Sequence, residues 1–390
     1  MIQRRGLAKI WYDVRFRGVL QQLILAIVVF ALASVIARNT IQNLTERNIA
    51  SGFDFLSSTA GFDINFHLID YSETSSYRDA LLVGILNTLL VSVIGIFFAT
   101  ILGFVLGVMR VSKNFLVASF AAFYVEVVRN IPLLLQIFFW YFAVLRTLPA
   151  PRESIAFGDK IFLNLRGLFV PRPMTEGSVP LFLIGIFAVI GALVYFGRRL
   201  RARRVETGSI PRGVYAWIVG AVLGPAVVYK LAGLSVHWEI PQLQGFNFQG
   251  GYVLSPELVS LGLSLSIYTA SFIAEIVRSG INATPKGQTE AAFSLGLTRM
   301  QSLRLIVIPQ ALRVIVPPLT SQFLNLTKNS SLGAAIAYPD IVLVFAGTVL
   351  MQTGQAVEVM FITMAFYLVI CLIISLFMNW YNKRISFESR

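Results

Sequence analysis

The chain has 390 residues, of which 56% are hydrophobic and only 13% are charged. Soluble proteins carry about 25% charged residues, and a soluble interior is too small to hide this much apolar surface. The composition therefore excludes the two or three soluble domains that the length alone would suggest. It indicates an integral membrane protein.

The charge balance is strongly basic, with 32 Lys and Arg against 19 Asp and Glu. In a soluble domain this excess would favour nucleic acid as a partner, but the cytoplasmic loops of membrane proteins also collect Lys and Arg. We therefore expect no nucleic-acid partner. One cysteine, Cys371, excludes a disulfide framework, and two histidines, His67 and His237, argue against a metal centre. We expect no metal and no cofactor.

Apolar runs of about 18 residues or more can cross the ~30 Å hydrocarbon layer as helices. The sequence contains eight such runs: Leu20–Ala37, Leu81–Met109, Phe115–Leu145, Pro180–Gly197, Gly213–Tyr229, Leu258–Val277, Val314–Ile336 and Val359–Met378. Pro132 falls within the third run, where it would kink or split a helix. The alternation typical of a membrane β-barrel is absent from the sequence. The pattern predicts an all-α, polytopic membrane protein with about eight transmembrane helices.

Basic residues occupy every second connection between these spans. They are Arg4, Arg5, Lys9, Arg15 and Arg17 before span 1, Arg110 and Lys113 after span 2, the run Arg198–Arg204 after span 4, five residues from Arg278 to Arg313 after span 6, and Lys383 and Arg384 after span 8. The positive-inside rule then places both ends of the chain in the cytoplasm. Span 1 is expected to remain as an anchor, because its apolar stretch is too long for a cleavable signal.

The basic loop between spans 6 and 7, residues 281–309, carries the clearest local signals. Thr284 and Pro285 read as an N-cap followed by proline at the first helical position. Gly296 suits a left-handed residue that ends a helix. The sequence therefore predicts a short helix between Gly287 and Leu295.

A second short helix should follow the first one. Thr298 to Gln301 is a capping-box pattern that opens it, and Pro309 is expected to end it. In the first helix, Ala291, Ala292 and Leu295 are expected to share one small apolar face. The simplest interpretation of this helix–Gly–helix element is an interfacial hairpin that only connects two spans.

The same loop carries a spaced motif: Glu290-Ala291-Ala292, three residues, Gly296, nine residues, and Ile306-Val307-Ile308-Pro309. It resembles the coupling-loop motif of binding-protein-dependent ABC transporter permeases, which is Glu-Ala-Ala, three residues, Gly, nine residues, Ile-any-Leu-Pro. The one departure is Ile308 in place of leucine. The resemblance implies that Glu290, Ala291, Ala292, Gly296, Ile306 and Pro309 form the surface that docks on the ATPase subunits.

Three further segments narrow the resemblance: Asn87-Thr88-Leu89, Glu126–Leu134 with Gln136, and Lys328–Leu332. Together they are similar to permeases of the polar amino-acid importers, of the histidine, glutamine and glutamate type. The similarity covers residues 81–145 and 258–381, the five-span core of that family. The three additional spans are similar to those of the enlarged general L-amino-acid transporter permeases of bacteria.

The resemblance implies the type I importer core of the ABC permeases, with three extra helices, in four parts. Residues 1–80 hold the cytoplasmic N-terminus, the anchor helix and an extracytoplasmic loop. Residues 81–147 form the first part of the core. Residues 148–257 are an insertion with two extra helices and a basic cytoplasmic loop. Residues 258–390 form the second part of the core and include the coupling loop 281–309.

The sequence contains no Walker-type glycine loop and no catalytic cluster, so the chain is not predicted to be an enzyme. The resemblance implies a permease subunit of an importer that takes up L-amino acids delivered by an extracytoplasmic binding protein. Two separate ATPase subunits would hydrolyse ATP, and a second, related permease subunit is favoured over a homodimer. The implied location is the lipid bilayer of a bacterial inner membrane.

Polar residues inside the spans are candidates for the substrate pathway, because a charge in hydrocarbon normally pairs or lines a cavity. Glu126 and Arg129 share one helical face with Asn130. This spacing favours a self-satisfied pair near the interface over a substrate contact.

A second group of polar residues lies in span 7. Lys328 could snorkel to an interface, pair with Glu275 of span 6, or meet a substrate carboxylate. Glu275 also precedes Arg278 by one turn, which suits a local ion pair. The candidate pathway residues are Glu275, Asn325, Lys328, Asn329 and Arg129.

An ion-coupled secondary amino-acid transporter is the alternative from another class. It accounts for eight spans and for the buried Glu and Lys, but it leaves the loop motif unexplained, and no inverted repeat supports it. A channel or a structural membrane subunit is a third hypothesis. Co-purification with a Walker-motif ATPase would discriminate between these classes.

Overall fold

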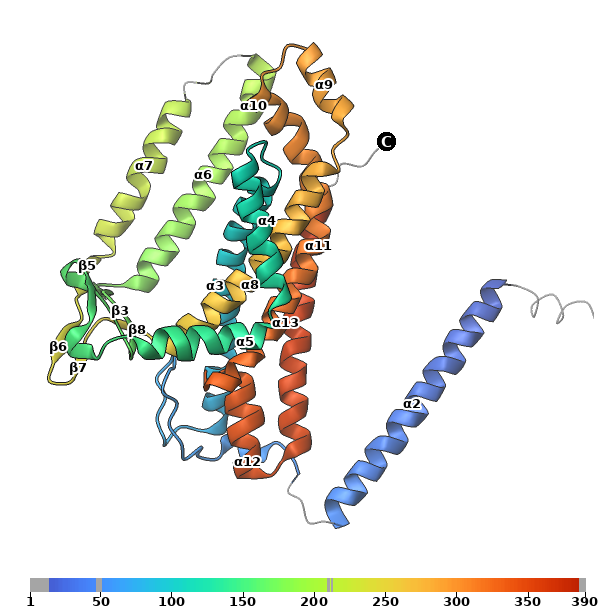
Figure 1. Ribbon diagram of the computed structural model, residues 1–390, viewed down its shortest axis with the longest axis vertical. Coiled ribbons are helices and arrows are strands. Elements are labelled where there is room, and N and C mark those ends of the chain that lie inside the picture. The colour runs from blue at the N-terminus through green and yellow to red at the C-terminus, as the bar shows by residue number, and fades with distance from the viewer. Residues whose placement is uncertain (1–13, 47–50, 209–210, 212, 386–390) are drawn as a thin grey trace, which may run out of the picture. The chain divides into compact units, whose positions relative to one another are not determined.

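The computed structural model describes residues 14–46, 51–208, 211 and 213–385 (Figure 1). Seven described helices are long and apolar enough to cross a membrane, or eight if the broken pair α4 and α5 counts as one span. This confirms the expected helical, polytopic membrane protein. The chain divides into two compact units, residues 1–130 with 265–390 and residues 131–264, and each is described by itself.

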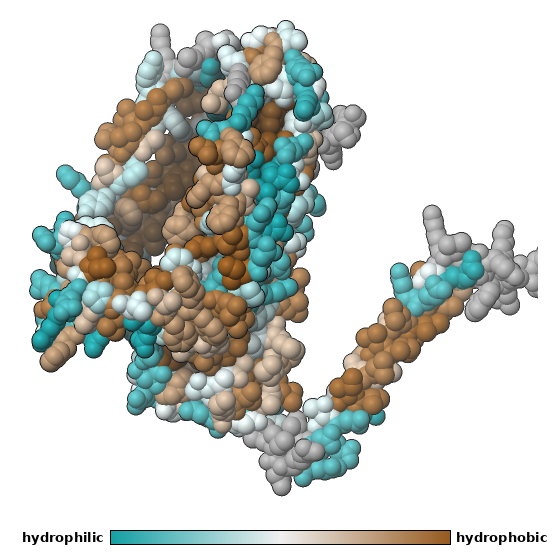
Figure 2. All heavy atoms as spheres, in the orientation of Figure 1, coloured by the Kyte–Doolittle hydropathy of each residue, from teal (hydrophilic) through white to brown (hydrophobic). Residues whose placement is uncertain are grey.

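The first unit contains most of the long helices. Its elements are α2 (Val14–Glu46), η1 (Asp54–Ser57), α3 (Tyr77–Arg110), α4 (Phe115–Asn130), the larger part of α8 (Pro256–Asn282), α9 (Lys286–Ser294), α10 (Arg299–Ser302), η6 (Leu303–Val307), α11 (Ile308–Asn329), η7 (Ser330–Ile336), η8 (Val342–Val349), α12 (Leu350–Thr353) and α13 (Ala356–Ile385). Hydrophobic side chains cover the middle of α2 and hydrophilic ones lie near its ends (Figure 2). This distribution suits a helix that crosses a bilayer.

Small residues let α3 and α8 approach closely. A β-carbon on Gly103 would lie 2.6 Å from Cβ of Ile273, and one on Gly107 would lie 2.6 Å from Cβ of Val277. Glycine at these two positions therefore permits the backbone contact that membrane helices use in place of a hydrophobic driving force.

Residues 51–76 fold against the start of α3. Ser76 and Asp79 form a capping box there, and the Phe55 ring lies 6.0 Å from the Tyr77 ring. The Tyr71 hydroxyl donates to the carbonyl oxygen of Phe62 at 3.1 Å, and burial raises the pKa of Tyr71 to about 12. That hydroxyl therefore stays protonated, and able to donate, to a higher pH than an ordinary tyrosine.

The second unit begins at the break that Pro132 was expected to cause. Helix α4 ends at Asn130, and α5 (Leu133–Phe138) starts directly after the proline. Proline lacks an N–H and bars its predecessor from helical geometry. The side chain of Gln136 donates to the carbonyl oxygen of Ile131 at 3.0 Å, which satisfies an acceptor that the break leaves open.

The other elements of the second unit are short segments around one helical hairpin. They are η2 (Phe139–Val144), η3 (Leu145–Thr147), η4 (Pro151–Glu153), β1 (Ile155–Phe157), η5 (Gly158–Lys160), β2 (Ile161–Asn164), β3 (Gly167–Val170), β4 (Arg172–Glu176), α6 (Val179–Thr207), α7 (Gly213–Leu231), β5 (Ser235–Glu239), β6 (Gln242–Gln244), β7 (Asn247–Gln249), β8 (Tyr252–Leu254) and the first turns of α8. Helices α6 and α7 lie side by side (Figure 1).

The strands form three small antiparallel sheets. One has four strands in the order β1-β2-β3-β8, and the others pair β4 with β5 and β6 with β7. The β4–β5 ribbon continues the α6–α7 hairpin, with Glu176 opposite Ser235 next to the helices. None of these strands was predicted, because segments of three to five residues are too short to show an alternating pattern.

Candidate functional site

The loop that joins α8 to α11 has the helix–Gly–helix form expected from its sequence (Figure 1). Gly296 has φ +78°, as predicted for a left-handed residue. Its N–H donates to the Phe293 carbonyl oxygen at 2.9 Å, and the N–H of Leu297 donates to that of Ala292 at 3.1 Å. These two bonds are the Schellman pattern that ends a helix. The end of α9 is therefore fixed by the backbone of Gly296.

The capping box that opens the second helix is also confirmed. The backbone N–H of Thr298 donates to the side-chain oxygen of Gln301 at 2.8 Å, and the Gln301 N–H donates back to the Thr298 hydroxyl at 3.4 Å. Thus α9 and α10 are both fixed at the turn between them. This makes the loop a stiff element and not a slack connection.

Two details of the predicted loop were wrong. Pro285, not Thr284, holds the N-cap position of α9. The Thr284 N–H still bonds to the Ile281 carbonyl oxygen at the end of α8, so Thr284 continues that helix end. Pro309 does not end a helix: the wide turn η6 runs into α11, and Pro309 lies in the first turn of α11. Proline is tolerated there because the wide turn η6 already interrupts the regular i to i−4 hydrogen bonds just before it.

The small apolar face expected on α9 is split. Ala292 is 1% exposed and packs inward, whereas Leu295 is 81% exposed and Ala291 and Glu290 are also exposed. Ala291 and Ala292 are consecutive, so their side chains leave the helix about 100° apart, and Leu295 is the C-cap residue at which α9 ends. Glu290 and Ala291 therefore lie on the outer surface, available to a partner.

Large apolar side chains add to this outer surface. They are Phe293, Leu295, Met300, Leu303 and Leu305, all of them exposed. Several exposed apolar residues on short helices mark an interaction site more often than a solvated loop. The exposed side of the loop thus has the character of a docking surface.

The C-terminal end of the motif meets the start of α9 in a groove of about 580 Å³. Ile306 and Pro309 line it together with Thr284, Gln288 and Arg313. The hydroxyl of Thr284 is buried without a hydrogen-bond partner among the described residues. The structure therefore brings Ile306 and Pro309 next to the start of α9.

Glu275 takes part in an ion-pair network at the end of α8. Its carboxylate accepts from Arg278 of the same helix, with one N–O distance of 3.1 Å, and it also pairs with Arg110 of α3. The local pair with Arg278 was expected, whereas the link to α3 was not. A pairing of Glu275 with Lys328 is not present between these two described side chains. This network fastens the base of the loop to α3.

Arg129 does not pair with Glu126. Both side chains are described and no ion pair joins them; the guanidinium of Arg129 lies over the Phe272 ring instead, 4.8 Å from its centroid. The self-satisfied pair favoured by the sequence was therefore wrong. A cation–π contact between α4 and α8 replaces it, because an aromatic face was available across the helix interface.

Helix α11 has two unlike faces. Leu319, Leu326 and Thr327 are buried, whereas Asn325 and Lys328 are exposed, and Asn329 is half-buried. The exposed face continues toward the start of the helix through Pro317, Pro318 and Ser321. Lys328 has no ion-pair partner among the described residues. A Lys and an Asn facing hydrocarbon are costly, so this stripe favours a second protein surface, a water-filled cavity or, for Lys328, the membrane interface.

One buried polar cluster was missed by the sequence analysis. The Asn87 side chain donates to the carbonyl oxygens of Phe66 and Pro339, both at 2.9 Å, and the Tyr338 hydroxyl donates to the Asn87 carbonyl oxygen at 2.8 Å. Asp340 is fully buried beside them and accepts from the Leu343 N–H at 2.8 Å. The signal was an aspartate inside an otherwise apolar stretch, which indicates a partner in the fold.

This cluster ties α3 to the connection between η7 and η8. A β-carbon on Gly84 would lie 2.9 Å from the Cα of Ile341, so the two segments meet backbone to backbone. Ala337, just before the cluster, has φ +61°, which L-residues rarely adopt. The segment after α11 is therefore locked in one conformation against α3.

Comparison with known proteins gives a family match over most of the chain. Residues 95–387 match the family of the binding-protein-dependent transport system inner membrane component. The YhdX protein of Escherichia coli (strain K12), named as an amino-acid ABC transporter permease, is 50% identical over 96% of this chain and 95% of its own length. The general L-amino acid transport system permease protein AapQ of Rhizobium johnstonii is 47% identical over 97% of this chain and 94% of its own length.

A third relative extends the comparison. The glutamate/glutamine/aspartate/asparagine transport system permease protein BztB of Rhodobacter capsulatus is 40% identical over 98% of this chain and 97% of its own length. These matches run through the insertion between residues 148 and 257. A crystal structure of an amino acid ABC transporter with histidines covers 79% of this chain and 95% of its own, at 20% identity and a TM-score of 0.47.

Proposed function

The chain belongs to the family of binding-protein-dependent transport system inner membrane components, and on that premise we propose that it forms one transmembrane half of an ATP-driven L-amino-acid importer. As a permease subunit it is the membrane component and not the ATPase. The observation that carries the proposal is the motif from Glu290 to Pro309, held on a stiff loop with an exposed apolar surface. The names of the three full-length relatives support amino acids as the substrate class.

The proposed mechanism begins at the loop. The ATPase subunit would contact Glu290, Ala291 and the apolar side chains beside them, and a stiff helix can transmit its movement without absorbing it. The end of α8 is linked to α3 through Glu275. A displacement of the loop is then carried to α3, α8 and α11 together. Two permease halves that move in this way would expose the pathway to one side and then to the other.

The proposed partners follow from the same surfaces. The loop fits an ATPase subunit, and an importer with two halves would hold two of them. The exposed polar stripe with Asn325 and Lys328 on α11 needs protein or a lined cavity in front of it, which favours a second, related permease subunit at this face. Arg129 and Asn329 remain candidates for the pathway. An extracytoplasmic binding protein would supply the amino acid.

Reconstituted transport tests the proposal directly. The permease with its partner subunits is placed in liposomes, and uptake of labelled amino acids from the liganded binding protein is measured. We expect uptake to require ATP on the ATPase side and to persist when sodium and proton gradients are collapsed. Uptake that follows an ion gradient without ATP would instead support the secondary transporter. A catalytically inactive ATPase subunit is the control.

The proposed location is a bacterial inner membrane with both ends of the chain in the cytoplasm. The basic residues Arg4, Arg5 and Lys9, on which the N-terminal side of this topology rests, lie outside the described residues, as does the end of the chain after Ile385.

Cysteine labelling checks the topology in the insertion. In a Cys371→Ser background, a cysteine placed at Arg201 should react with a membrane-impermeant maleimide only after the cells are opened, because the arginine run is expected inside. A cysteine at Asp159 should react in cells with an intact inner membrane and a permeabilised outer membrane. Labelling of position 201 under the latter condition would contradict the proposed arrangement of α6 and α7.

A further inference from the structure

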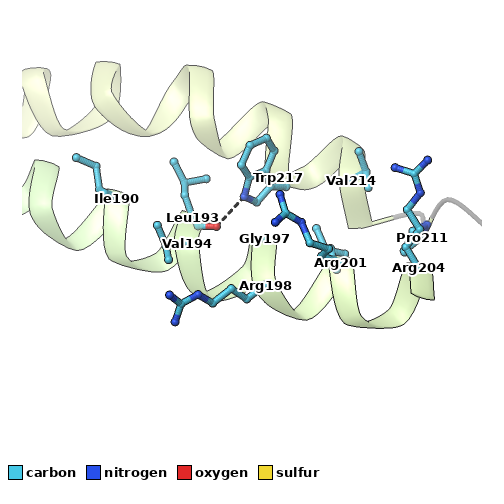
Figure 3. A pocket seen from close by; sticks show the side chains of 11 residues that line it. Ile190, Leu193, Val194, Gly197, Arg198, Arg201, Arg204, Pro211, Val214 and Trp217 are labelled. Carbon is cyan, nitrogen blue, oxygen red and sulfur yellow. Dashed lines mark hydrogen bonds between the residues drawn. The ribbon is translucent and has the colours of Figure 1, made fainter. Parts of the chain in front are cut away.

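Helices α6 and α7 enclose a groove of about 550 Å³ along one side of their hairpin (Figure 3). Ile190, Val194 and Gly197 of α6 line its apolar length, and Trp217 of α7 lies across from them. Toward one end the lining changes to Arg198, Arg201 and Arg204. Both helices bury none of their apolar window inside the chain. Within the second unit, these apolar stretches of α6 and α7 are therefore exposed.

The groove has the polarity profile of a bilayer leaflet. Val194, Gly197, Arg201 and Arg204 follow each other at three- and four-residue spacing, so they share one face of α6. At 1.5 Å per residue, the 29 residues of α6 reach about 43 Å, longer than the ~30 Å hydrocarbon layer. The arginine turns at its end then lie at the level of the lipid headgroups.

Trp217 marks the boundary between the two regions. Its indole N–H donates to the Leu193 carbonyl oxygen at 2.8 Å, which fixes the ring beside the groove and next to Arg201 (Figure 3). Tryptophan is enriched where the hydrocarbon meets the headgroups. The apolar part of the groove thus lies below this level and the arginines lie at it.

The arginines carry positive charge that no described carboxylate neutralises. Arg198, Arg201 and Arg204 are exposed, and none of them forms an ion pair with a described acidic side chain. Guanidinium groups bind phosphate through two parallel hydrogen bonds. Basic pockets between membrane helices bind the headgroups of anionic lipids.

We propose that this groove binds an anionic phospholipid, with an acyl chain along Ile190 and Val194 and the phosphate held by Arg201 and Arg204. A partner protein on the same face would need an acidic strip aligned with an apolar ridge. One phospholipid supplies a phosphate for the arginine end of the groove and an acyl chain for its apolar end. The proposal needs only a membrane-embedded hairpin and does not depend on what the importer carries. The lipid would act as a fixed link between the insertion and the bilayer.

Quenching of Trp217 fluorescence by brominated lipids tests the proposal. The full-length permease, in its assembled complex, is placed in nanodiscs of phosphatidylcholine with increasing fractions of brominated phosphatidylglycerol or brominated phosphatidylcholine. The signal of a Trp217→Phe complex is subtracted to remove the other tryptophans. Each basic side chain near an anionic headgroup strengthens binding roughly fivefold, so two should give phosphatidylglycerol a preference of roughly 30-fold. Arg201→Gln/Arg204→Gln should remove that preference.

The matched control is Arg199→Gln/Arg203→Gln, which removes the same charge from the same turns of α6 but from the groove on the other side of the hairpin. It should keep most of the preference for phosphatidylglycerol. Equal losses in both double variants would overturn the site, because they would show attraction by net charge alone. Absence of quenching by either lipid would also overturn it, because protein would then cover the groove. Neither outcome bears on ATP-driven uptake, which is measured separately.

Discussion

Replacement of Gly296 by valine should abolish the stimulation of ATP hydrolysis by the liganded binding protein, a loss of about tenfold or more. Gly296 holds φ +78° and its N–H completes the Schellman pattern at the end of α9. A β-branched residue adopts this conformation only at a cost of order 1 kcal/mol or more. The strain would be released by a change in the turn, and Glu290 and Ala291 would then leave their fixed place relative to α10.

The structure offers a matched control for this experiment. No heavy atom lies within 4 Å of a β-carbon built on either Gly296 or Gly287, but Gly287 lies in the first turns of α9 at a helical φ. Gly287→Val adds the same volume to the same short helix without backbone strain. It should therefore retain most of the stimulation. A difference between the two variants isolates the left-handed turn as the cause.

The measurement uses the purified complex in lipid, with the ATPase rate determined with and without liganded binding protein. The stoichiometry of bound ATPase subunits is measured on the same samples, and membrane insertion is checked by the amount of permease recovered. We expect Gly296→Val to insert normally but to hold the ATPase subunits weakly. Full stimulation with the ATPase bound at the normal ratio would refute the coupling role of this loop.

Local chemistry explains which parts of the fold were predictable. Pro132 breaks a helix wherever it lies, Gly296 suits a left-handed stop, and Thr298 with Gln301 forms a capping box from four neighbouring residues. Each of these signals acts within one or two turns of chain. They predicted the break between α4 and α5 and the shape of the loop before any tertiary contact was known.

Contacts between distant segments explain the rest. Nothing near Arg110 in the sequence indicates that it pairs with Glu275, 165 residues later. Arg129 was assigned to its neighbour Glu126, but the Phe272 ring lies beside it in the fold. The hydrogen bond from the Tyr338 hydroxyl to the Asn87 carbonyl oxygen likewise joins residues 251 positions apart. Sequence spacing reports which residues share a helix face, and it does not report what the face meets.

The polar stripe on α11 is defined by its spacing in the sequence together with its exposure in the structure. Its helical spacing placed Asn325 and Lys328 together, and the structure adds that they are exposed while Leu326 and Thr327 are buried. The buried side is already occupied by this chain. The polar side is therefore free to contact another part of the assembled transporter. We assign it to the substrate pathway between two permease halves, where the charge of Lys328 can interact with a zwitterionic amino acid.

Replacement of Lys328 by methionine should lower amino-acid uptake about tenfold or more while the assembly stays intact. Methionine is similar to lysine in length and keeps an apolar stem, but it lacks the ammonium group. The hydrogen bond between that ammonium and the substrate carboxylate would be lost, and such a bond to a charged group contributes roughly 1.5–3 kcal/mol. Acidic amino acids should lose most and basic ones least, because the ammonium attracts carboxylates and repels cations. Uptake of acidic, neutral and basic amino acids by reconstituted complex measures this order.

Lys230→Met provides the control for loss of a lysine at a membrane helix. Lys230 lies exposed in the last turn of α7, where its side chain can reach the interface without meeting substrate. Its replacement should leave the relative uptake of the three classes unchanged. If Lys328→Met also leaves the kinetics of all three classes unchanged, Lys328 is a snorkelling anchor, and the pathway must run along another face. If acidic substrates alone are lost, the ammonium of Lys328 contacts the side-chain carboxylate as the substrate passes α11.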